Sequence, residues 1–242
     1  MFEILIDNLI IQLTFIFLFN FFSFSLINFF ILKKNFLIDL KYSSSHKKLI
    51  NSDIVPVSGG VIIYLNFLFF NNFDLFNLSL ITLIFLIGLF ADTQKLISAS
   101  KRLIFQTLII LIFIYINELY LRSIRINLFD YYLNYNFFSL IFIFFCLLIL
   151  INGSNFIDGS NFQCSGYFLA ILTILIFLNL NLVVIDNIEI VYFLYPVLIS
   201  FIIYNFFNKS YLGDGGTYLL SFIIGYVLIN FQINQNVSPY FI

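Results

Sequence analysis

Long apolar stretches, separated by short polar ones, dominate this chain of 242 residues. A helix that crosses a membrane needs about 20 mostly apolar residues, with some tolerance for shorter ones. On that basis we expect an all-α polytopic transmembrane bundle that forms a single domain over residues 1–242. The pattern predicts about eight spans, at residues 9–32, 57–73, 76–91, 103–120, 136–151, 166–185, 189–207 and 216–231.

Composition supports this class of protein. Hydrophobic residues make up 62% of the chain and charged residues 10%, and the mean hydropathy is +1.06. These values exclude a soluble enzyme with one anchor. The first apolar stretch follows Glu3 and Asp7, without the basic residues that precede the core of a signal peptide. We therefore expect it to remain as a helix.

The basic residues predict the orientation of the bundle. Each crossing reverses the chain, so the loops after spans one, three, five and seven share one side. Nine of the eleven Lys and Arg residues lie in those loops, and only Arg122 and Arg125 lie in the others. By the positive-inside rule the first side is cytoplasmic and the N-terminus is outside. The nine are Lys33, Lys34, Lys41, Lys47, Lys48, Lys95, Lys101, Arg102 and Lys209.

Polar residues framed by glycine gather on that same side. Polar groups at membrane depth are costly unless they face water, a partner or a cavity. We therefore expect a site that takes its substrate from the cytoplasmic face. The groups are His46 with Gly59 and Gly60, Asp92 with Lys95, the run Asn152–Asn161, and residues 213–216.

The run Asn152–Asn161 has the sequence N-G-S-N-F-I-D-G-S-N. Gly159 permits a tight turn after Asp158, and the amides of Asn152, Asn155 and Asn161 supply both donors and acceptors. This combination favours a substrate-binding loop. An interfacial loop without a function is the alternative, because Asn is abundant throughout the chain.

Two further carboxylates lie at predicted helix ends. Asp92, with Lys95 one helical turn away, could hold a divalent cation beside an anionic group; a simple helix end at the lipid headgroups is the alternative. Asp214 lies in the glycine-framed start of the last span, which suits phosphate oxygens and Mg²⁺. Here the alternative is a plain turn.

The remaining polar residues are less specific. His46, the only histidine, lies in a basic stretch that fits either a phosphate contact or a solvated loop. The intramembrane amides Asn20, Asn28, Asn66 and Asn230 are expected to make hydrogen bonds between helices. Together, the carboxylates, amides and glycines predict Mg²⁺-assisted chemistry on a phosphorylated substrate. The sequence contains no pattern typical of a P-loop, a serine triad, a zinc site or a nucleic-acid patch.

In this order the motifs resemble those of the polyprenyl-phosphate N-acetylhexosamine-1-phosphate transferases. This is glycosyl transferase family 4, related to the phospho-MurNAc-pentapeptide translocase. The resemblance runs from about residue 30 to the end, and its third and fourth blocks are the most specific. The four blocks are H-K-K with P-V-S-G-G (46–60), G-L-F-A-D-T-Q-K through K-R-L-I-F-Q (88–106), N-G-S-N-F-I-D-G-S-N (152–161) and L-G-D-G-G-T-Y-L-L (212–220).

The resemblance implies an activity and its partners. A sugar-1-phosphate would pass from a UDP-N-acetylhexosamine to a polyprenyl phosphate such as undecaprenyl phosphate, with release of UMP. This step would initiate the assembly of a cell-envelope polysaccharide at the cytoplasmic face of a bacterial inner membrane. The implied cofactor is Mg²⁺, with Mn²⁺ as an alternative. The partners are the UDP-sugar, the polyprenyl phosphate and the lipid bilayer; a homodimer is left open and no nucleic acid is expected.

The resemblance also assigns roles to residues. It implies Asp92, Asp158 and Asp214 as catalytic carboxylates, with Asp214 and Asp92 as metal ligands. Lys95 would contact the nucleotide and Tyr211 would stack on uracil. The full set of implied substrate-binding residues is His46, Lys95, Asn152, Asn155, Gly159, Asn161, Tyr211 and Gly213.

The chain departs from the family pattern at several places. Ala91 stands where members commonly have a first Asp, Asn161 replaces a second Asp, and Ser43 to Ser45 occupy the place of a usual Arg. Members usually have ten or eleven spans and a late His-containing loop, so the chain is expected to be C-terminally short. An inactive relative that acts as a membrane assembly partner is therefore an alternative. A transporter is a weaker one, because the polar residues gather at one face instead of the midplane.

Overall fold

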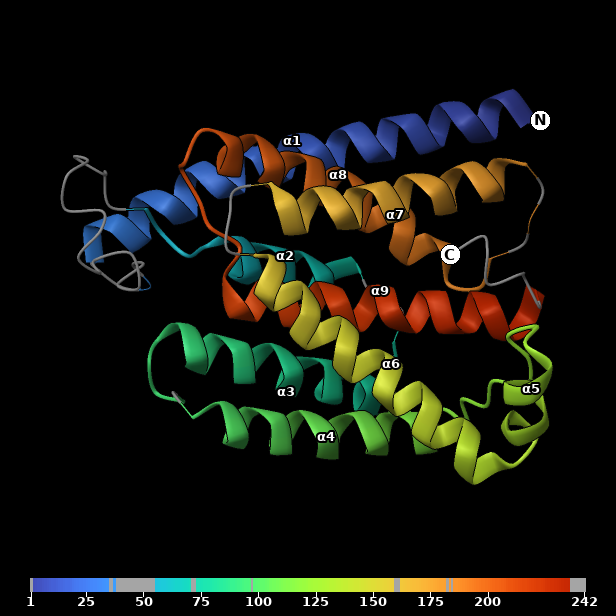
Figure 1. Ribbon diagram of the computed structural model, residues 1–242. Coiled ribbons are helices and arrows are strands. Elements are labelled where there is room, and N and C mark those ends of the chain that lie inside the picture. The colour runs from blue at the N-terminus through green and yellow to red at the C-terminus, as the bar shows by residue number, and fades with distance from the viewer. Residues whose placement is uncertain are drawn as a thin grey trace.

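The computed structural model describes residues 2–34, 37, 55–70, 73–96, 98–158, 162–181, 183 and 185–235. All regular secondary structure in these residues is helical, which confirms the all-α polytopic bundle (Figure 1). The helices are α1 (Phe2–Lys34), α2 (Gly59–Phe70), α3 (Leu75–Asp92), α4 (Ala99–Ile116), α5 (Asn127–Leu133), α6 (Asn136–Ile157), α7 (Gln163–Leu180), α8 (Ile188–Phe206) and α9 (Gly213–Gln235).

Each of the eight expected spans corresponds to a helix, but two expectations need correction. Among the described residues seven helices are long and apolar enough to cross a membrane, and α2 is not one of them. With 12 residues, α2 is about 18 Å long, shorter than the hydrocarbon layer. Helix α5 lies in the connection between α4 and α6, where no element was predicted. Its apolar residues were too few to signal a span.

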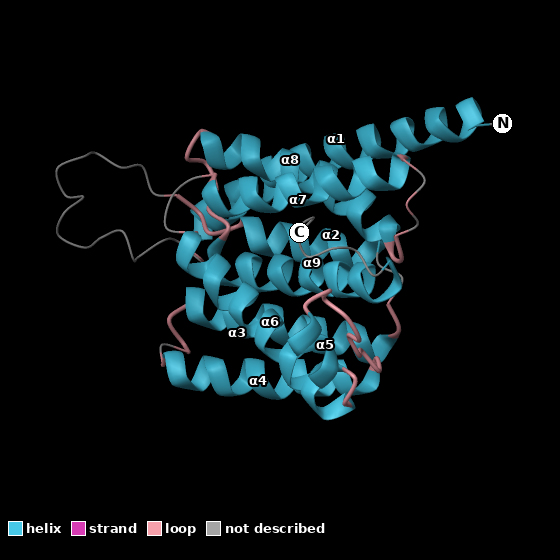
Figure 2. Ribbon diagram, turned by 45° about the vertical axis from the view of Figure 1, so that its right-hand side comes forward, coloured by secondary structure: helices cyan, strands magenta, loops and turns pink. Residues whose placement is uncertain are grey.

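Helix α9 is the centre of the bundle. It packs against α2, α3, α6 and α7, and it is the most buried of the spanning helices. In both ribbon views α9 runs through the middle, with α3 and α4 on one side and α1, α7 and α8 on the other (Figures 1 and 2). The outer helices expose many large apolar side chains, as expected where the surrounding solvent is lipid.

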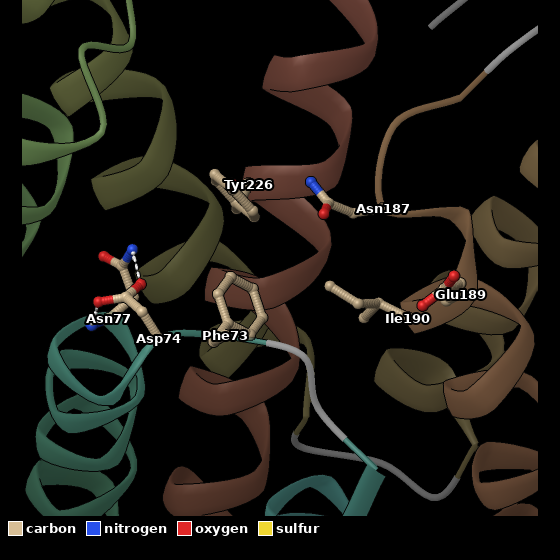
Figure 3. A pocket seen from close by; sticks show the side chains of 7 residues that line it. All are labelled: Phe73, Asp74, Asn77, Asn187, Glu189, Ile190 and Tyr226. Carbon is tan, nitrogen blue, oxygen red and sulfur yellow. Dashed lines mark hydrogen bonds between the residues drawn. The ribbon is translucent and has the colours of Figure 1, made fainter.

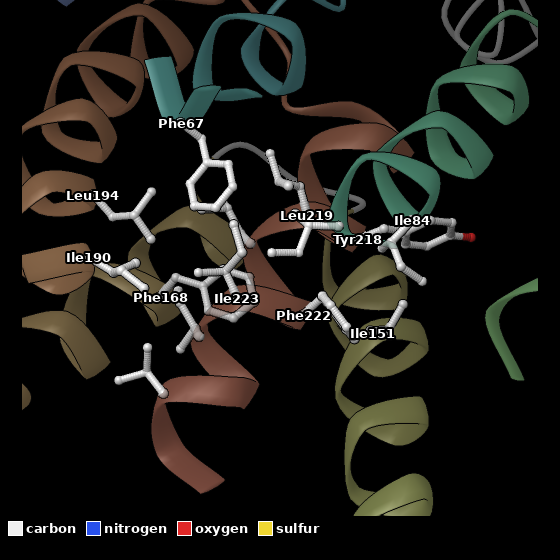
Figure 4. Packing of buried hydrophobic residues seen from close by; sticks show 14 of the residues in the cluster. Phe67, Ile84, Ile151, Phe168, Ile190, Leu194, Tyr218, Leu219, Phe222 and Ile223 are labelled. Carbon is white, nitrogen blue, oxygen red and sulfur yellow. The ribbon is translucent and has the colours of Figure 1, made fainter. Parts of the chain in front are cut away.

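The core is built around successive turns of α9. Helix α9 packs against α2, α3, α6 and α7, so one helix joins most of the bundle. Interhelical packing in a membrane depends on such close contacts, because lipid removes most of the hydrophobic driving force. The residues in Figure 4 include Tyr218, Leu219, Phe222 and Ile223 of α9, with Phe67, Ile84, Ile151, Phe168, Ile190 and Leu194 around them.

Glycines allow the start of α9 to approach its neighbours at backbone distance. A Cβ atom added to Gly88 of α3 would lie 2.5 Å from the carbonyl oxygen of Asp214. On the other side, Gly60 of α2 lies directly against the backbone of Gly216. The first turn of α9 is therefore held between α2 and α3 by small residues, a common arrangement in membrane bundles.

The intramembrane amides do not all behave as expected. The side-chain NH₂ of Asn28 donates to the carbonyl of Lys209 at 3.0 Å, which confirms an interhelix partner for this residue. Asn20 and Asn66 instead donate to carbonyls one turn earlier in their own helices, those of Ile16 and Ile62. The interhelix prediction is wrong for these two NH₂ groups, because a short polar side chain on a helix can reach the preceding turn.

The glycine contact at α3 can be tested with a matched pair of substitutions. Gly88→Ala forces a methyl group against the backbone of α9 and should lower the free energy of unfolding by about 1–3 kcal/mol. Gly153→Ala, in α6, meets no atom within 4 Å and should leave stability unchanged or raise it by up to about 1 kcal/mol. Thermal unfolding of the purified protein in detergent measures both. Equal stability of the two variants would contradict the close approach.

Candidate functional site

Four helix ends meet at one end of the bundle, which we call the site end. Helices α3 and α6 finish there and helices α4 and α9 begin there (Figure 1). The chain therefore brings together polar residues from segments more than 100 positions apart, as the sequence predicted. They are Asp92 at the end of α3, Arg102 and Gln106 near the start of α4, Asn152, Asn155 and Asp158 at the end of α6, and Asp214 and Tyr218 at the start of α9.

The carboxylate of Asp92 caps helix α9. Its Oδ1 accepts the backbone N–H of Asp214 at 2.8 Å, and its Oδ2 accepts that of Gly215 at 3.0 Å. Gly213, with φ at +76°, makes the turn, and a Cβ there would lie 2.7 Å from Asp92 Oδ2. A negative side chain at a helix N-terminus satisfies free N–H groups and complements the helix dipole. Asp92 thus joins α3 to α9 at the site end.

This cap changes one expectation from the sequence. The glycine-framed start of the last span was predicted to offer its N–H groups to phosphate oxygens. The N–H groups of Asp214 and Gly215 are bound by Asp92 instead. These two N–H groups are therefore not available to a phosphate. Sequence alone did not indicate this, because the partner of the N–H groups lies on another helix.

Asp214 faces the guanidinium of Arg102. Arg102 Nη1 donates to Asp214 Oδ2 at 2.7 Å, and only about a tenth of the Asp214 side chain is exposed. A charge this deeply buried needs a paired or strongly hydrogen-bonded partner. The same Nη1 approaches the hydroxyl of Tyr218 at 3.4 Å. One guanidinium therefore links α4 to two residues on successive turns of α9.

Below this ion pair lies a layer of amides. The side-chain NH₂ of Asn155 donates to the hydroxyl of Tyr218 at 3.4 Å, and that of Asn152 donates to Oε1 of Gln106 at 3.0 Å. Gln106 and Tyr218 are fully buried or nearly so. The Nε2 of Gln106 makes no hydrogen bond to another described residue. Polar side chains of α4, α6 and α9 thus meet within the helical bundle.

The other residues predicted to belong to the site differ in where they lie. Asp158 is half-buried as the residue that follows α6, so the run from Asn152 to Ile157 is helix and not loop. Tyr211 is half-buried in the segment before α9. Lys95 is exposed beyond the end of α3, so it does not share a helical turn with Asp92 as expected. His46, Gly159 and Asn161 lie outside the described residues.

Arg102, Gln106 and Tyr218 were not singled out from the sequence. Their spacing carried a signal: Arg102 and Gln106 are four residues apart on α4, and Asp214 and Tyr218 are four apart on α9. Residues at this spacing share a helix face. A search for polar pairs at i and i+4 inside apolar spans would have found both pairs, although not which faces meet.

The donor set is compatible with a hard divalent cation. Asp92 and Asp214 supply two carboxylates at the start of α9, and that of Asp214 already pairs with the positive charge of Arg102. Mg²⁺ is commonly held by one or two carboxylates together with substrate phosphates. Within the described part of the chain no group of three His, Cys, Asp or Glu residues could hold a metal ion, so Asp158 does not complete a three-residue cluster.

The opposite end of the bundle contains a separate hollow of about 200 Å³ (Figure 3). Asp74 is exposed there and caps α3, the helix that ends at Asp92. Hydrogen bonds donated by the backbone N–H of Asn77 and neighbouring groups lower the pKa of the Asp74 carboxyl. This carboxylate therefore serves its own helix, and the hollow does not adjoin the site. The lining residues are Phe73, Asp74, Asn77, Asn187, Glu189, Ile190 and Tyr226.

Comparison with known proteins shows the family of the chain. The model of glycosyl transferase family 4 matches residues 75–232, which include Asp92, Asp158 and Asp214. The chain belongs to glycosyl transferase family 4. No curated protein matches the chain. The family match confirms the resemblance seen in the motifs. It indicates a membrane-bound glycosyl or phosphoglycosyl transferase.

The role of Asp92 as the cap of α9 in this glycosyl transferase family 4 protein can be tested without substrate. Asp92→Ala leaves two N–H groups of α9 without their acceptor and should lower the free energy of unfolding by about 1–2 kcal/mol. Lys95→Ala, three residues away and exposed, should not change it. Thermal unfolding in detergent compares the two. If Asp92→Ala is as stable as Lys95→Ala, the carboxylate does not support the helix.

Proposed function

We propose that this protein transfers a sugar-1-phosphate from a UDP-N-acetylhexosamine to a polyprenyl phosphate such as undecaprenyl phosphate, with release of UMP. The product would be a lipid-linked sugar pyrophosphate that initiates a cell-envelope polysaccharide. The family match supports the reaction class. The observation that carries the proposal is the meeting of Asp92, Asp214 and Arg102 at one end of a membrane bundle.

The charge balance of this cluster suits two anionic substrates joined through a divalent cation. The cluster contains two carboxylates and one guanidinium. Asp92 and Asp214 would hold Mg²⁺, or Mn²⁺ in its place. When bound, the ion supplies positive charge to the pyrophosphate oxygens as UMP leaves. Carboxylates by themselves repel anionic substrates, so a bound cation would help to bring the two substrates together.

The side chains of the chain itself would orient the donor. Arg102 carries a planar fork of N–H donors that fits phosphate oxygens, and its guanidinium is partly exposed. Asn155, on the turn of α6 before Asp158, would contact the nucleotide-sugar, as would Asn152. Tyr211 would stack on the uracil ring, since it is half-buried in the segment that leads to Asp214. Asp158 would help to position the donor.

The polyprenyl phosphate acceptor would not require a catalytic base at position 91, where this chain has Ala. A phosphate monoester has a second pKa of about 6, so the lipid phosphate is largely ionised at neutral pH. Ala91 is buried directly before Asp92. The nucleophile would therefore be the ionised phosphate oxygen, aligned by Arg102 and by the carboxylate site. Positioning and charge stabilisation supply most of the catalysis in phosphoryl transfer.

The activity can be measured directly. Purified protein with undecaprenyl phosphate, Mg²⁺ and a panel of UDP-N-acetylhexosamines should release UMP, and removal of the ion with EDTA should stop it. Asp214→Asn should lower the rate at least about 100-fold, because a carboxylate ligand and its charge are lost. Arg102→Gln should lower it about 10- to 100-fold, and Arg102→Lys less.

Glu189→Gln is the matched control, because Glu189 is an exposed carboxylate at the opposite end of the bundle. It should retain the full rate. A folded protein that releases no UMP with any donor, and is as silent as Asp214→Asn, would contradict the transferase. The role as a membrane assembly partner would then stand.

We also propose that the site end faces the cytoplasm of a bacterial inner membrane, because Lys33, Lys34, Lys95, Lys101 and Lys209 lie toward it.

The orientation can be tested by cysteine labelling. In a variant without Cys146 and Cys164, Ser98→Cys between α3 and α4 should resist a membrane-impermeant maleimide in intact cells. Asn127→Cys, at the start of α5, should react; both positions are exposed. The reverse pattern would place the site outside the cell.

A further inference from the structure

Asn205 joins two separate segments of the site end. It lies in the last turn of α8 and is 5% exposed. Its Oδ1 accepts the backbone N–H of Phe162 at 2.7 Å, and its Nδ2 donates to the carbonyl of Ser210 at 2.9 Å. An N–H can only donate and a carbonyl can only accept, so the orientation of the amide is determined. Both ends of one buried side chain are in use.

The two segments lead to the two halves of the proposed site. Phe162 follows Asp158 by four residues and immediately precedes α7. Ser210 precedes Asp214 by four residues and lies next to Tyr211. One segment therefore leads from the residues proposed to orient the donor, and the other leads to a proposed metal ligand. No bond of the Asp92–Arg102–Asp214 cluster involves Asn205.

The Ser210 side of this connection is itself firmly held. The hydroxyls of Ser210 and Ser58 are 2.7 Å apart, and Ser58 donates to Oδ1 of Asn28. A serine hydroxyl has one proton to donate, so Ser210 must donate to Ser58. The NH₂ of Asn28 then returns to the carbonyl of Lys209. All three side chains are more than nine-tenths buried, which makes this a satisfied internal network.

Backbone hydrogen bonds also hold the residues between Ser210 and Asp214. The N–H of Tyr211 donates to the carbonyl of Pro56 at 2.9 Å. The N–H of Gly59 donates to Tyr211, and that of Gly60 donates to Leu212 at 3.0 Å. The segment before α9 is therefore fastened to the start of α2. Asn205 extends this rigid platform to the start of α7.

The Phe162 side carries backbone strain. Phe162 has φ at +73°, in the left-handed region that a bulky residue rarely adopts. Such a conformation persists only where its surroundings impose it, and it is found preferentially at functional sites. The hydrogen bond to Asn205 holds the N–H of this residue.

We propose that Asn205 is a positioning residue of the transfer reaction: it sets the donor-binding end of α6 and the start of α7 in register with Tyr211 and Asp214. This role rests on the proposed function, and Asn205 itself contacts no substrate. Misplacement of reacting groups by about 1 Å can lower a rate 100-fold. Removal of the amide should therefore slow transfer far more than it weakens the fold.

The test compares Asn205→Leu with Asn77→Leu. Asn77 is also a buried amide, which exchanges hydrogen bonds with Asn117 at the opposite end. Both variants should lose similar thermal stability. Asn205→Leu should lower kcat about 30- to 100-fold, with less than about a threefold change in the Kd of UDP measured by calorimetry. Asn77→Leu should keep its kcat.

Hydrogen exchange provides a readout that needs no activity. In Asn205→Leu the backbone amides of residues 162–166 and 209–213 should exchange at least about 10-fold faster than in the wild type, while Asn77→Leu leaves these segments unchanged. When ionised, the carboxylate of Asn205→Asp keeps an acceptor for Phe162 but has no donor for Ser210, so at a pH where it is ionised faster exchange should be confined to residues 209–213. If Asn205→Leu does not fold, Asn205→Ser replaces it.

The outcomes separate the two proposals. Wild-type protein that releases no UMP contradicts the proposed function, while the exchange data still decide whether Asn205 couples the two segments. Unchanged exchange at both segments overturns the positioning role. An active wild type whose Asn205→Leu and Asn77→Leu variants lose stability and retain kcat equally also overturns it.

Discussion

The site end depends on one carboxylate at the start of one helix. Asp92 binds the first N–H groups of α9, and this cap determines where Asp214 and the turn at Gly213 lie. Because α9 is the central helix, the same interaction connects the site to the core of the bundle. The approach is close enough only because Gly60 and Gly88 leave room for the α9 backbone. A larger side chain at either position would separate the capping carboxylate from its helix.

The cap also affects which N–H groups of α9 could bind an anion. A free helix N-terminus attracts phosphate through its N–H groups and its dipole. Here Asp92 accepts two of these N–H groups, and Asp214 in the same turn pairs with Arg102. The cap thus gives Asp92 a structural role in addition to the proposed catalytic one.

Buried polar side chains give the surroundings of the site their rigidity. Asn28, Ser58, Asn205 and Ser210 form hydrogen bonds between α1, the start of α2, the end of α8 and the segment before α9. In lipid no water is available to replace a broken hydrogen bond, so a satisfied network holds one arrangement of the loops. The amide layer of Asn152, Asn155, Gln106 and Tyr218 differs, since its contacts to Tyr218 are long and Gln106 Nε2 makes no hydrogen bond to a described residue. The first network supports the site, and the second adjoins it.

The order of apolar and polar residues along the sequence was sufficient to predict the helices and the end of the bundle at which the carboxylates gather. Lipid forces the backbone into helices, and strict alternation of crossings assigns each loop to a side. The same pattern overestimated α2 and gave no indication of α5. It also predicts a loop at Asn152–Ile157, because polar asparagines end the apolar stretch there. The helix nevertheless continues to Ile157.

The sequence by itself determined the membrane class, the helical crossings and the clustering of Asp92, Asp158 and Asp214 toward one end. Only the tertiary structure decided that Asp92 caps α9, that Arg102 pairs with Asp214, and that Asn205 bridges Phe162 and Ser210. The physical reason is the rotation of each helix about its own axis. In a span that is apolar on all sides, hydropathy does not specify which face meets a neighbour, so packing at Gly60 and Gly88 and the buried hydrogen bonds must select it.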